Sequence, residues 1–225
     1  MSNLPPRITH TPKLVLIEAT KDDVVDIREA FYGGFTDPFI LKLFPNIAAQ
    51  HKWWDDANLD AITQKPKSER YLIMKDMAPE AGPGGKVTGY AKWQCPTGDN
   101  PSLHEFYPRF PPWSGEGDSD LCDRFFGTIH AARDEYFEKK GEPQHYYLDM
   151  LAVMPEYRKL GIGGTMTEWG CKLADEHGKW AYIDASDMGG PVYARYGFVP
   201  LDPINIPGET FTCTPYARAP KGKTA

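Results

Sequence analysis

The sequence predicts an α/β protein in the α+β sense, in which strands and helices share one core. Residues 146–197 alternate between a strand, a glycine-rich turn, a helix and a second strand. Two more strand patterns, 71–74 and 87–93, lie on either side of a turn-rich loop and indicate a hairpin. Because the chain has 225 residues, one domain with a full core is expected, and we place it at 13–218.

The N-terminal part is expected to alternate strand and helix. Residues 1–12 are polar and contain prolines, so we expect a flexible N-terminus, which a strand follows at 14–19. A helix should begin at Thr20, because this capping residue precedes carboxylates two and three positions later. Residues 31–39 are expected to end that helix and open a turn.

An irregular insertion interrupts the regular elements in the middle of the chain. A helix is expected at about 46–64, and Gly89 in the second hairpin strand predicts a bulge or a close backbone approach. Residues of about 95–120 are rich in proline and glycine, so we interpret them as a loop insertion. A lid over a binding site and a surface loop fit it equally well. A helix follows at 120–140, and 219–225 should form a flexible tail.

Composition excludes several classes of protein. The net charge of −6 and the pI near 5.5 argue against a nucleic-acid partner. No apolar run is long enough to span a membrane and no signal peptide is evident, so we expect a cytoplasmic protein without a membrane partner. The four cysteines are scattered without ligand spacing, which predicts reduced thiols and no metal site.

The glycine-rich turn at 158–164 has the chemistry of an anion site. A helix that begins directly after it leaves several backbone N–H groups without partners in the helix. Together with the positive end of the helix dipole they suit a pyrophosphate, and glycines let phosphates approach the backbone closely. Arg158 adds a positive charge at the rim. An ordinary strand–turn–helix connection has the same pattern, so the turn alone does not decide the function.

Two motifs in the right order resemble the GNAT superfamily of acyl-CoA-dependent N-acetyltransferases. They are Arg-x-x-Gly-x-Gly at 158–163, after a strand that ends in Val-x-Pro, and Pro-Val-Tyr-Ala-Arg-Tyr-Gly-Phe at 191–198. The likeness is specific over about 146–201. The layout and the ending 209–214 look most like small-molecule enzymes of the puromycin N-acetyltransferase type. The resemblance implies the GNAT fold, a mixed, mostly antiparallel central sheet splayed at the coenzyme A site with helices on both faces.

The resemblance also implies acetyl-CoA as the cofactor. In the family the turn holds the coenzyme A pyrophosphate, and the preceding strand offers backbone groups to the pantetheine arm. An asparagine that often contacts the coenzyme is replaced here by Asp-Met-Gly-Gly at 187–190, so that contact stays open, with glycine backbone as the substitute. The predicted cofactor-binding residues are Leu151, Ala152, Val153, Arg158, Lys159, Leu160, Gly161, Ile162, Gly163, Gly164, Thr165, Gly189 and Tyr196.

Two residues are the candidates for the chemistry. Tyr193 matches the family's tyrosine and is predicted to donate a proton to the leaving thiolate, although a packing role is the alternative. Asp149 is the predicted base for the amine proton. Strand alternation puts it on the face of Leu151 and Val153, where apolar neighbours would raise its pKa. A carboxylate that only orients the amine is the alternative.

Aromatic and acidic residues are predicted to line an acceptor pocket, because the family's first two helices border it. Aromatic residues at helical spacing are also typical of a core, so that alternative stays open. Asp184 and Asp187 are further candidates for the base. The predicted substrate-binding residues are Phe31, Phe35, Asp37, Trp53, Trp93 and Asp184.

Taken together, the residues and the resemblance predict an acetyl-CoA-dependent N-acetyltransferase that modifies a primary amine of a small molecule by direct attack in a ternary complex. A peptide or protein N-acetyltransferase is the alternative among enzymes. A non-catalytic coenzyme A-binding regulatory module is the alternative outside them. The proline-rich insertion and the aromatic residues favour a closed, small-molecule site, and a homodimer is compatible with the family.

Overall fold

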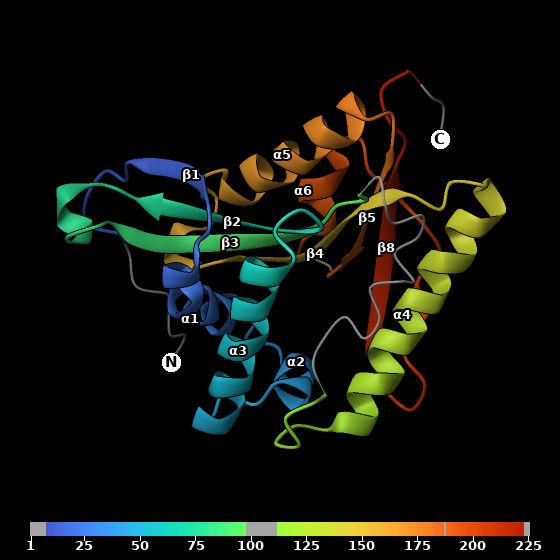
Figure 1. Ribbon diagram of the computed structural model, residues 1–225, viewed down its shortest axis with the longest axis horizontal. Coiled ribbons are helices and arrows are strands. Elements are labelled where there is room, and N and C mark those ends of the chain that lie inside the picture. The colour runs from blue at the N-terminus through green and yellow to red at the C-terminus, as the bar shows by residue number, and fades with distance from the viewer. Residues whose placement is uncertain (1–7, 98–111, 187, 223–225) are drawn as a thin grey trace.

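A computed structural model of the protein describes residues 8–97, 112–186 and 188–222, and its strands form a central eight-stranded sheet (Figure 1). The order is β1-β2-β3-β4-β5-β8-β6, and β7 pairs with β8. Neighbouring strands are antiparallel except β4 and β5, which run parallel, so the predicted mixed, mostly antiparallel sheet is confirmed. The strands are β1 Leu14–Glu18, β2 Glu69–Asp76, β3 Lys86–Gln94, β4 His145–Val153, β5 Trp180–Ala185, β6 Val199–Pro200, β7 Ile204–Asn205 and β8 Thr212–Arg218.

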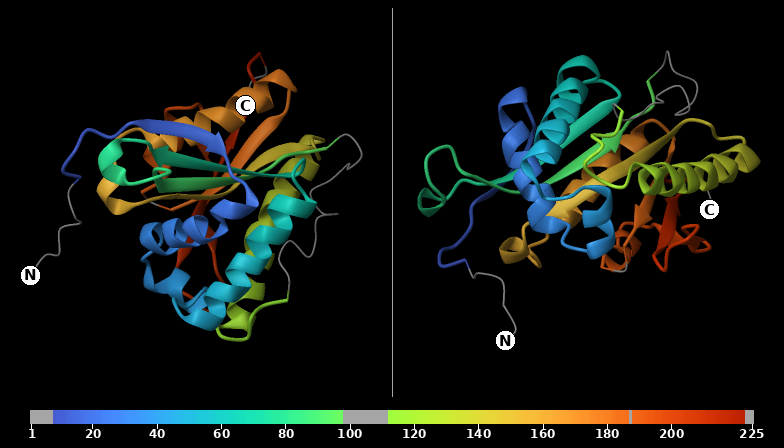
Figure 2. Two further views of the ribbon diagram at one scale, coloured as in Figure 1. Left: turned by 60° about the vertical axis from the view of Figure 1, so that its left-hand side comes forward. Right: turned by 90° about the horizontal axis from the view of Figure 1, so that it is seen from below.

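Helices cover both faces of the sheet, as predicted. One core cluster joins the sheet to α1–α4, and a second joins the other face to α5 and α6. Figure 1 shows α5 and α6 above the sheet and α1–α3 below it, and the right-hand view of Figure 2 shows α1, α3 and α4 across the lower face. The helices are α1 Val24–Gly34, α2 Pro38–Leu43, α3 Ala48–Gln64, α4 Ser119–Lys140, α5 Ile162–Glu176 and α6 Gly190–Ala194, with short 3₁₀ turns at Lys21–Asp23, Pro79–Ala81 and Pro155–Tyr157.

Parts of three predicted segments lie outside the described residues. They are 1–7 of the N-terminus, 98–111 of the insertion and 223–225 of the tail, together with Asp187. Within the described part of the chain, no helix is both long and apolar enough to cross a membrane, and the four cysteines are buried free thiols.

Local sequence explains where the first helices begin. Thr20 and Asp23 form a reciprocal capping box, so the predicted start at Thr20 is confirmed, with one 3₁₀ turn before α1. α1 ends at Gly34 within the segment 31–39, as predicted, but after three further residues α2 begins, which was not predicted. Asp37 accepts a hydrogen bond from the Phe39 N–H at 2.8 Å, and Pro38 occupies the first helical position. The Asp-Pro pair supplies both helix-start signals, and the prediction missed them.

The pairing of β4 changes partway along the strand. Its parallel pairing with β5 runs from His145 to Leu148 only, opposite Trp180 to Ile183. On its other side, the register with β3 shifts between Leu148 and Met150, so Asp149 is the extra residue of a β-bulge. From Asp149 to Val153 the strand keeps β3 and diverges from β5. The sheet is therefore splayed at this point, as the resemblance implied.

Candidate active site

The helix α5 begins beside the opening between β4 and β5, with a bare N-terminus. Gly161 adopts a left-handed backbone with φ of 82° and supplies no side-chain cap. The first N–H of the helix bonded to its own turn is that of Thr165, which donates to the Gly161 carbonyl at 2.9 Å. The amides of Ile162, Gly163 and Gly164 precede it, and with the positive end of the helix dipole they can bind an anion; we call these three amides the anion cradle.

The turn before α5 is tied to the rest of the site through Arg158. Its guanidinium donates to the Gly34 carbonyl at 3.0 Å and to the Val153 carbonyl at 3.4 Å, so it joins the end of α1 to the end of β4. The side chain stays exposed at the rim, where the sequence placed its charge. Lys159 has a positive φ of 67°, which makes the turn tight without a glycine at that position.

The end of β4 presents its two faces to two helices. A Cβ on Gly163 would lie 3.4 Å from Leu151 and 3.9 Å from Val153, so these residues face α5. Ala152 points the other way, where a Cβ on Gly34 of α1 would lie 2.8 Å from it. Gly89 of β3 also lies close to the backbone of β4, because a Cβ there would meet the Ala152 carbonyl. This is the close backbone approach that the glycine in the strand pattern predicted. The end of β4 thus lies between α5 and α1, and beyond Leu148 its other edge is no longer paired with β5.

The two tyrosines of the second motif lie on the α5 side of the sheet. Tyr193 is buried beside Phe198 and Tyr216, and burial raises the pKa of its hydroxyl. No described residue hydrogen-bonds that hydroxyl. Tyr196 lies over the first turn of α5, because a Cβ on Gly164 would be 2.5 Å from its Oη. The structure thus brings Tyr196 to the anion cradle and Tyr193 into the core beside it.

The backbone groups of Gly189, a predicted cofactor-binding residue, form hydrogen bonds within their own turn and do not point to the cradle. Its N–H donates to the Ser186 carbonyl at 2.9 Å, and its carbonyl accepts from the N–H of Val192 at 2.8 Å. Both groups serve the turn before α6. The glycine instead gives room to Tyr193, whose ring a Cβ would meet at 2.7 Å.

Asp149 lies on the opposite face from the one that the alternation predicted. The bulge reverses the pattern, so Leu148 and Leu151 share the α5 face, while Asp149 points with Lys92 and Gln94 toward the side of α1–α4. Its neighbours are also not the expected apolar ones. Asp149 Oδ2 is 3.4 Å from Lys92 Nζ and accepts from Gln94 Nε2 at 3.3 Å. The expected apolar surroundings are therefore corrected, although the carboxylate remains 1 % exposed.

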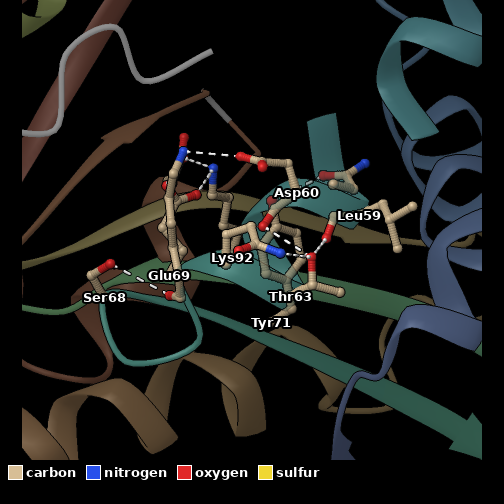
Figure 3. Close-up of polar contacts among 11 residues, drawn as sticks. Leu59, Asp60, Thr63, Ser68, Glu69, Tyr71 and Lys92 are labelled. Carbon is tan, nitrogen blue, oxygen red and sulfur yellow. Dashed lines mark hydrogen bonds and ion pairs between the residues drawn. The ribbon is translucent and has the colours of Figure 1, made fainter. Parts of the chain in front are cut away.

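Lys92 is the centre of a buried polar cluster on this face (Figure 3). Its Nζ is 2.5 Å from Glu69 Oε2, and it lies 5.5 Å from the centroid of the Tyr71 ring. Tyr71 in turn donates to Asn58 Oδ1 at 2.9 Å. One ammonium therefore lies between two carboxylates, Glu69 and Asp149, and it holds both in fixed positions.

The six predicted substrate-binding residues do not form one group. Phe31, Phe35 and Trp53 belong to the aromatic cluster on the α1–α4 side. Asp37 is exposed and caps α2. Trp93 is fully buried on the other face, where its Nε1 donates to the Met166 carbonyl of α5 at 3.2 Å. The assignment of Trp93 to the acceptor pocket is therefore corrected, because its position in β3 turns it away from α1–α4.

Asp184 lies one residue beyond the parallel β4–β5 pairing. Its Oδ2 accepts from the Tyr147 hydroxyl at 2.9 Å, which places it beside the opening. Tyr147 also carries the guanidinium of Arg133 over its ring, 4.3 Å from the centroid. Sequence reasoning missed Lys92, Glu69 and Arg133. For Lys92 the available signal was a charged residue inside a strand pattern. For Arg133 it was a position four residues from both Ile129 and Phe137, which puts a charged side chain on the apolar face of a helix.

The splayed mixed sheet and the bare helix N-terminus at its opening define the class of acyl-transfer enzymes with the GNAT fold. The model of the acetyltransferase (GNAT) family matches residues 47–198, which is more than half of the chain. The chain belongs to this family, and membership makes it an N-acetyltransferase. A search of curated proteins gave no match.

Solved structures show the same fold across almost the whole chain. One is described as a histone acetyltransferase HPA2 and related acetyltransferase from Corynebacterium glutamicum, with TM-score 0.62, 21% identity, and 94% of this chain and 99% of that chain covered. A polyamine N-acetyltransferase from Drosophila melanogaster has TM-score 0.62, 10% identity, and 92% and 100% covered. A mosquito protein described as arylalkylamine N-acetyltransferase like 5b has TM-score 0.63 and 13% identity, with 92% of this chain and 100% of that chain covered. The finer likeness to the puromycin type stays a prediction.

Proposed function

We propose that the protein transfers an acetyl group from acetyl-CoA to the primary amine of a small molecule, by direct attack in a ternary complex. The observation that carries the proposal is the anion cradle at the start of α5, which lies directly beside the free backbone edge of β4. A pyrophosphate fits the cradle, because Gly163 and Gly164 put no side chain over the amides. An extended pantetheine arm fits the strand edge.

The bound coenzyme would supply the thioester, and the chain's residues would do the rest. Backbone amides at the end of β4 would polarise the thioester carbonyl where negative charge develops. Asp149 would bind the ammonium form of the acceptor and take its proton, since a protonated amine has no free lone pair. The Tyr193 hydroxyl is protonated at neutral pH, since a tyrosine pKa is ordinarily near 10 and burial raises it further, so it is in the form that can donate to the leaving sulfur.

The buried cluster also supports an amine as the acceptor. Lys92 keeps Asp149 in place on the side of α1–α4, opposite the α5 face that bears the cradle. An acceptor on that side and a coenzyme on the other would meet at the opening of the sheet. Two of the proteins with the same fold are described as acting on polyamines and on arylalkylamines, which supports a small amine. The description of a third as a histone acetyltransferase keeps peptide amines as the alternative.

Release of free coenzyme A thiol with a panel of small primary amines and lysine peptides tests the proposal. We expect turnover with at least one small amine and a loss of about 100-fold or more in Asp149→Asn, in the range of a lost general base. Asp37→Asn is the matched control, because it changes a predicted acidic residue that the structure assigns to a helix cap. Turnover with lysine peptides alone would favour the alternative.

A further inference from the structure

Arg133 belongs to the buried face of α4, and two of its side-chain nitrogens make no hydrogen bond to the described residues. Its side chain is 1 % exposed, and among the described residues neither Nε nor Nη1 has a hydrogen-bond partner. Asp134 Oδ1 forms an ion pair with Nε at 3.8 Å, which is too long for a hydrogen bond. Buried N–H groups are normally hydrogen-bonded, so an arginine with two unbonded nitrogens is a candidate for binding something that comes from outside the chain.

The guanidinium of Arg133 lies over the Tyr147 ring, with its carbon 4.3 Å from the ring centroid, in a cation–π contact. This contact uses the π face of the tyrosine and none of the arginine's hydrogen-bond donors. The N–H groups of a guanidinium lie in its plane and form a fork that matches a carboxylate with two parallel bonds. His130, one turn earlier on α4, cannot balance the charge of Arg133, because an imidazole is neutral or positive; burial and the neighbouring Arg133 lower its pKa to about 2, so it adds no second positive charge.

The strand register puts Arg133 next to the proposed amine site. Tyr147 is paired with Gln94 and therefore shares its face of the sheet, and Gln94 donates to Asp149. Tyr147 and Asp149 are two residues apart on β4, and Arg133 lies over the Tyr147 ring, so its guanidinium and the Asp149 carboxylate lie on the same face of the sheet. An amine and an acidic group of one small molecule can therefore reach both side chains.

We infer that the acceptor is an amine that also carries a carboxylate, and that Arg133 binds this carboxylate while Asp149 binds the amine. The inference rests on the proposed function and narrows its substrate class. It makes Arg133 a specificity-determining residue with no part in proton transfer. It also separates this chain from enzymes of the same fold that are described as acting on polyamines and arylalkylamines.

Matched pairs of amino acids and their decarboxylated amines provide the test. The pairs are phenylalanine and phenethylamine, lysine and cadaverine, and arginine and agmatine, assayed by thiol release with acetyl-CoA. We expect the best amino acid to exceed its decarboxylated partner at least tenfold in kcat/KM. Equal or better use of the decarboxylated member in every pair would overturn the inference, whatever the variants do.

Variants of Arg133 show whether this side chain sets the preference. Arg133→Met should reduce kcat/KM for the amino acid at least tenfold, mainly through KM, and change that of the amine less than threefold. Arg133→Lys keeps the charge without the fork and should lie in between. Arg124→Met, on the exposed side of the same helix, is the control and should change neither. An unchanged preference in a folded Arg133→Met would mean that a buried water satisfies the guanidinium, and would overturn the inference.

Failure of the inference and failure of the proposed function give different results. If the proposed function fails, acetyl-CoA does not stabilise the protein and no amine of either kind releases thiol. If only the inference fails, acetyl-CoA stabilises the protein, and kcat/KM is the same for an amino acid and for its decarboxylated amine. A protein that binds acetyl-CoA but is neither stabilised by nor active on any carboxylate-bearing member also contradicts the inference.

Discussion

Lys92 and Asp149 face each other at the register shift between β3 and β4, with Lys92 Nζ 3.4 Å from Asp149 Oδ2. The bulge turns the carboxylate to this side of the sheet, and the lysine holds it there. Glu69 is bonded to the same ammonium. The candidate base is therefore set by a backbone irregularity and a buried ion cluster together, and neither is sufficient alone.

Removal of the Lys92 ammonium should destabilise the fold. In Lys92→Met the carboxylates of Glu69 and Asp149 lose their common cation inside the protein, and breaking a buried pair typically costs about 3–5 kcal/mol. Urea denaturation measures the change in free energy of unfolding. Lys86→Met is the control, because its pair with Glu156 is half exposed and should contribute about 1 kcal/mol or less. Equal losses in the two variants would contradict the cluster's role.

Two glycines in helices should respond in opposite directions to alanine. Gly170 of α5 packs directly on the Trp93 ring, so a methyl group there forces the helix off the sheet and should cost about 1–3 kcal/mol. Gly127 of α4 has open space around it, so Gly127→Ala should stabilise by up to about 1 kcal/mol through helix propensity. Thermal unfolding of both variants checks this. A harmless Gly170→Ala would mean that Trp93 is free to move.

Acid should weaken the protein through Asp76. Burial alone would raise the pKa of this carboxyl, but hydrogen bonds from the Ala78 and Lys13 N–H groups and from His10 and Tyr157 lower it to about 2. Because the folded pKa is below the unfolded value near 3.8, the contribution is complete above about pH 4 and disappears as the pH falls toward 2. Its size is roughly 2 kcal/mol. Asp76→Asn should show a correspondingly flatter loss of stability over that interval, and parallel curves would contradict the lowered pKa.

Tyr193→Phe should separate chemistry from packing. The ring is buried, while the hydroxyl is bonded to none of the described residues, so the fold and the unfolding temperature should change little. If the hydroxyl donates to the leaving sulfur, kcat should fall about 100-fold with acetyl-CoA binding intact. Tyr196→Phe is the matched control and should affect binding of the coenzyme more than kcat, because its hydroxyl lies over Gly164. An unchanged kcat in Tyr193→Phe would leave that tyrosine with a packing role.

The sequence was sufficient for the features that depend on local periodicity and turns. The helix start at Thr20, the hairpin of β2 and β3, and the run from β4 to β5 all follow from patterns within a few residues of each other. The sequence pattern predicts that the helix begins directly after the turn 158–164, whereas α5 begins three residues earlier, at Ile162. The difference arises because glycines, which weaken a helix pattern, lie inside the first turn of α5.

Features that depend on strand register could not be predicted in the same way. A one-residue bulge reverses every later side chain of a strand, so alternation put Asp149 on the wrong face. The position of Trp93 depends on the same register. Arg133 required the packing of α4 against Tyr147, which joins residues of two elements, and the buried pairing of Lys92 with Glu69 joins two strands across the sheet. The pattern of a single element can mark such a charged residue as buried, but it cannot name the partner, which lies on another element.

Binding of acetyl-CoA to the cradle at the start of α5 is the most direct test of the account. Thermal unfolding with and without the coenzyme should show a clear stabilisation, about 2.7 kcal/mol at a hundred times the dissociation constant. Arg158→Glu should abolish it, because this exposed side chain lies at the rim of the cradle and a carboxylate there repels a pyrophosphate. Lys172→Glu, the same reversal of charge at an exposed position further along α5, should keep the shift. No stabilisation of the wild type, or an undiminished shift in Arg158→Glu, would contradict the coenzyme site.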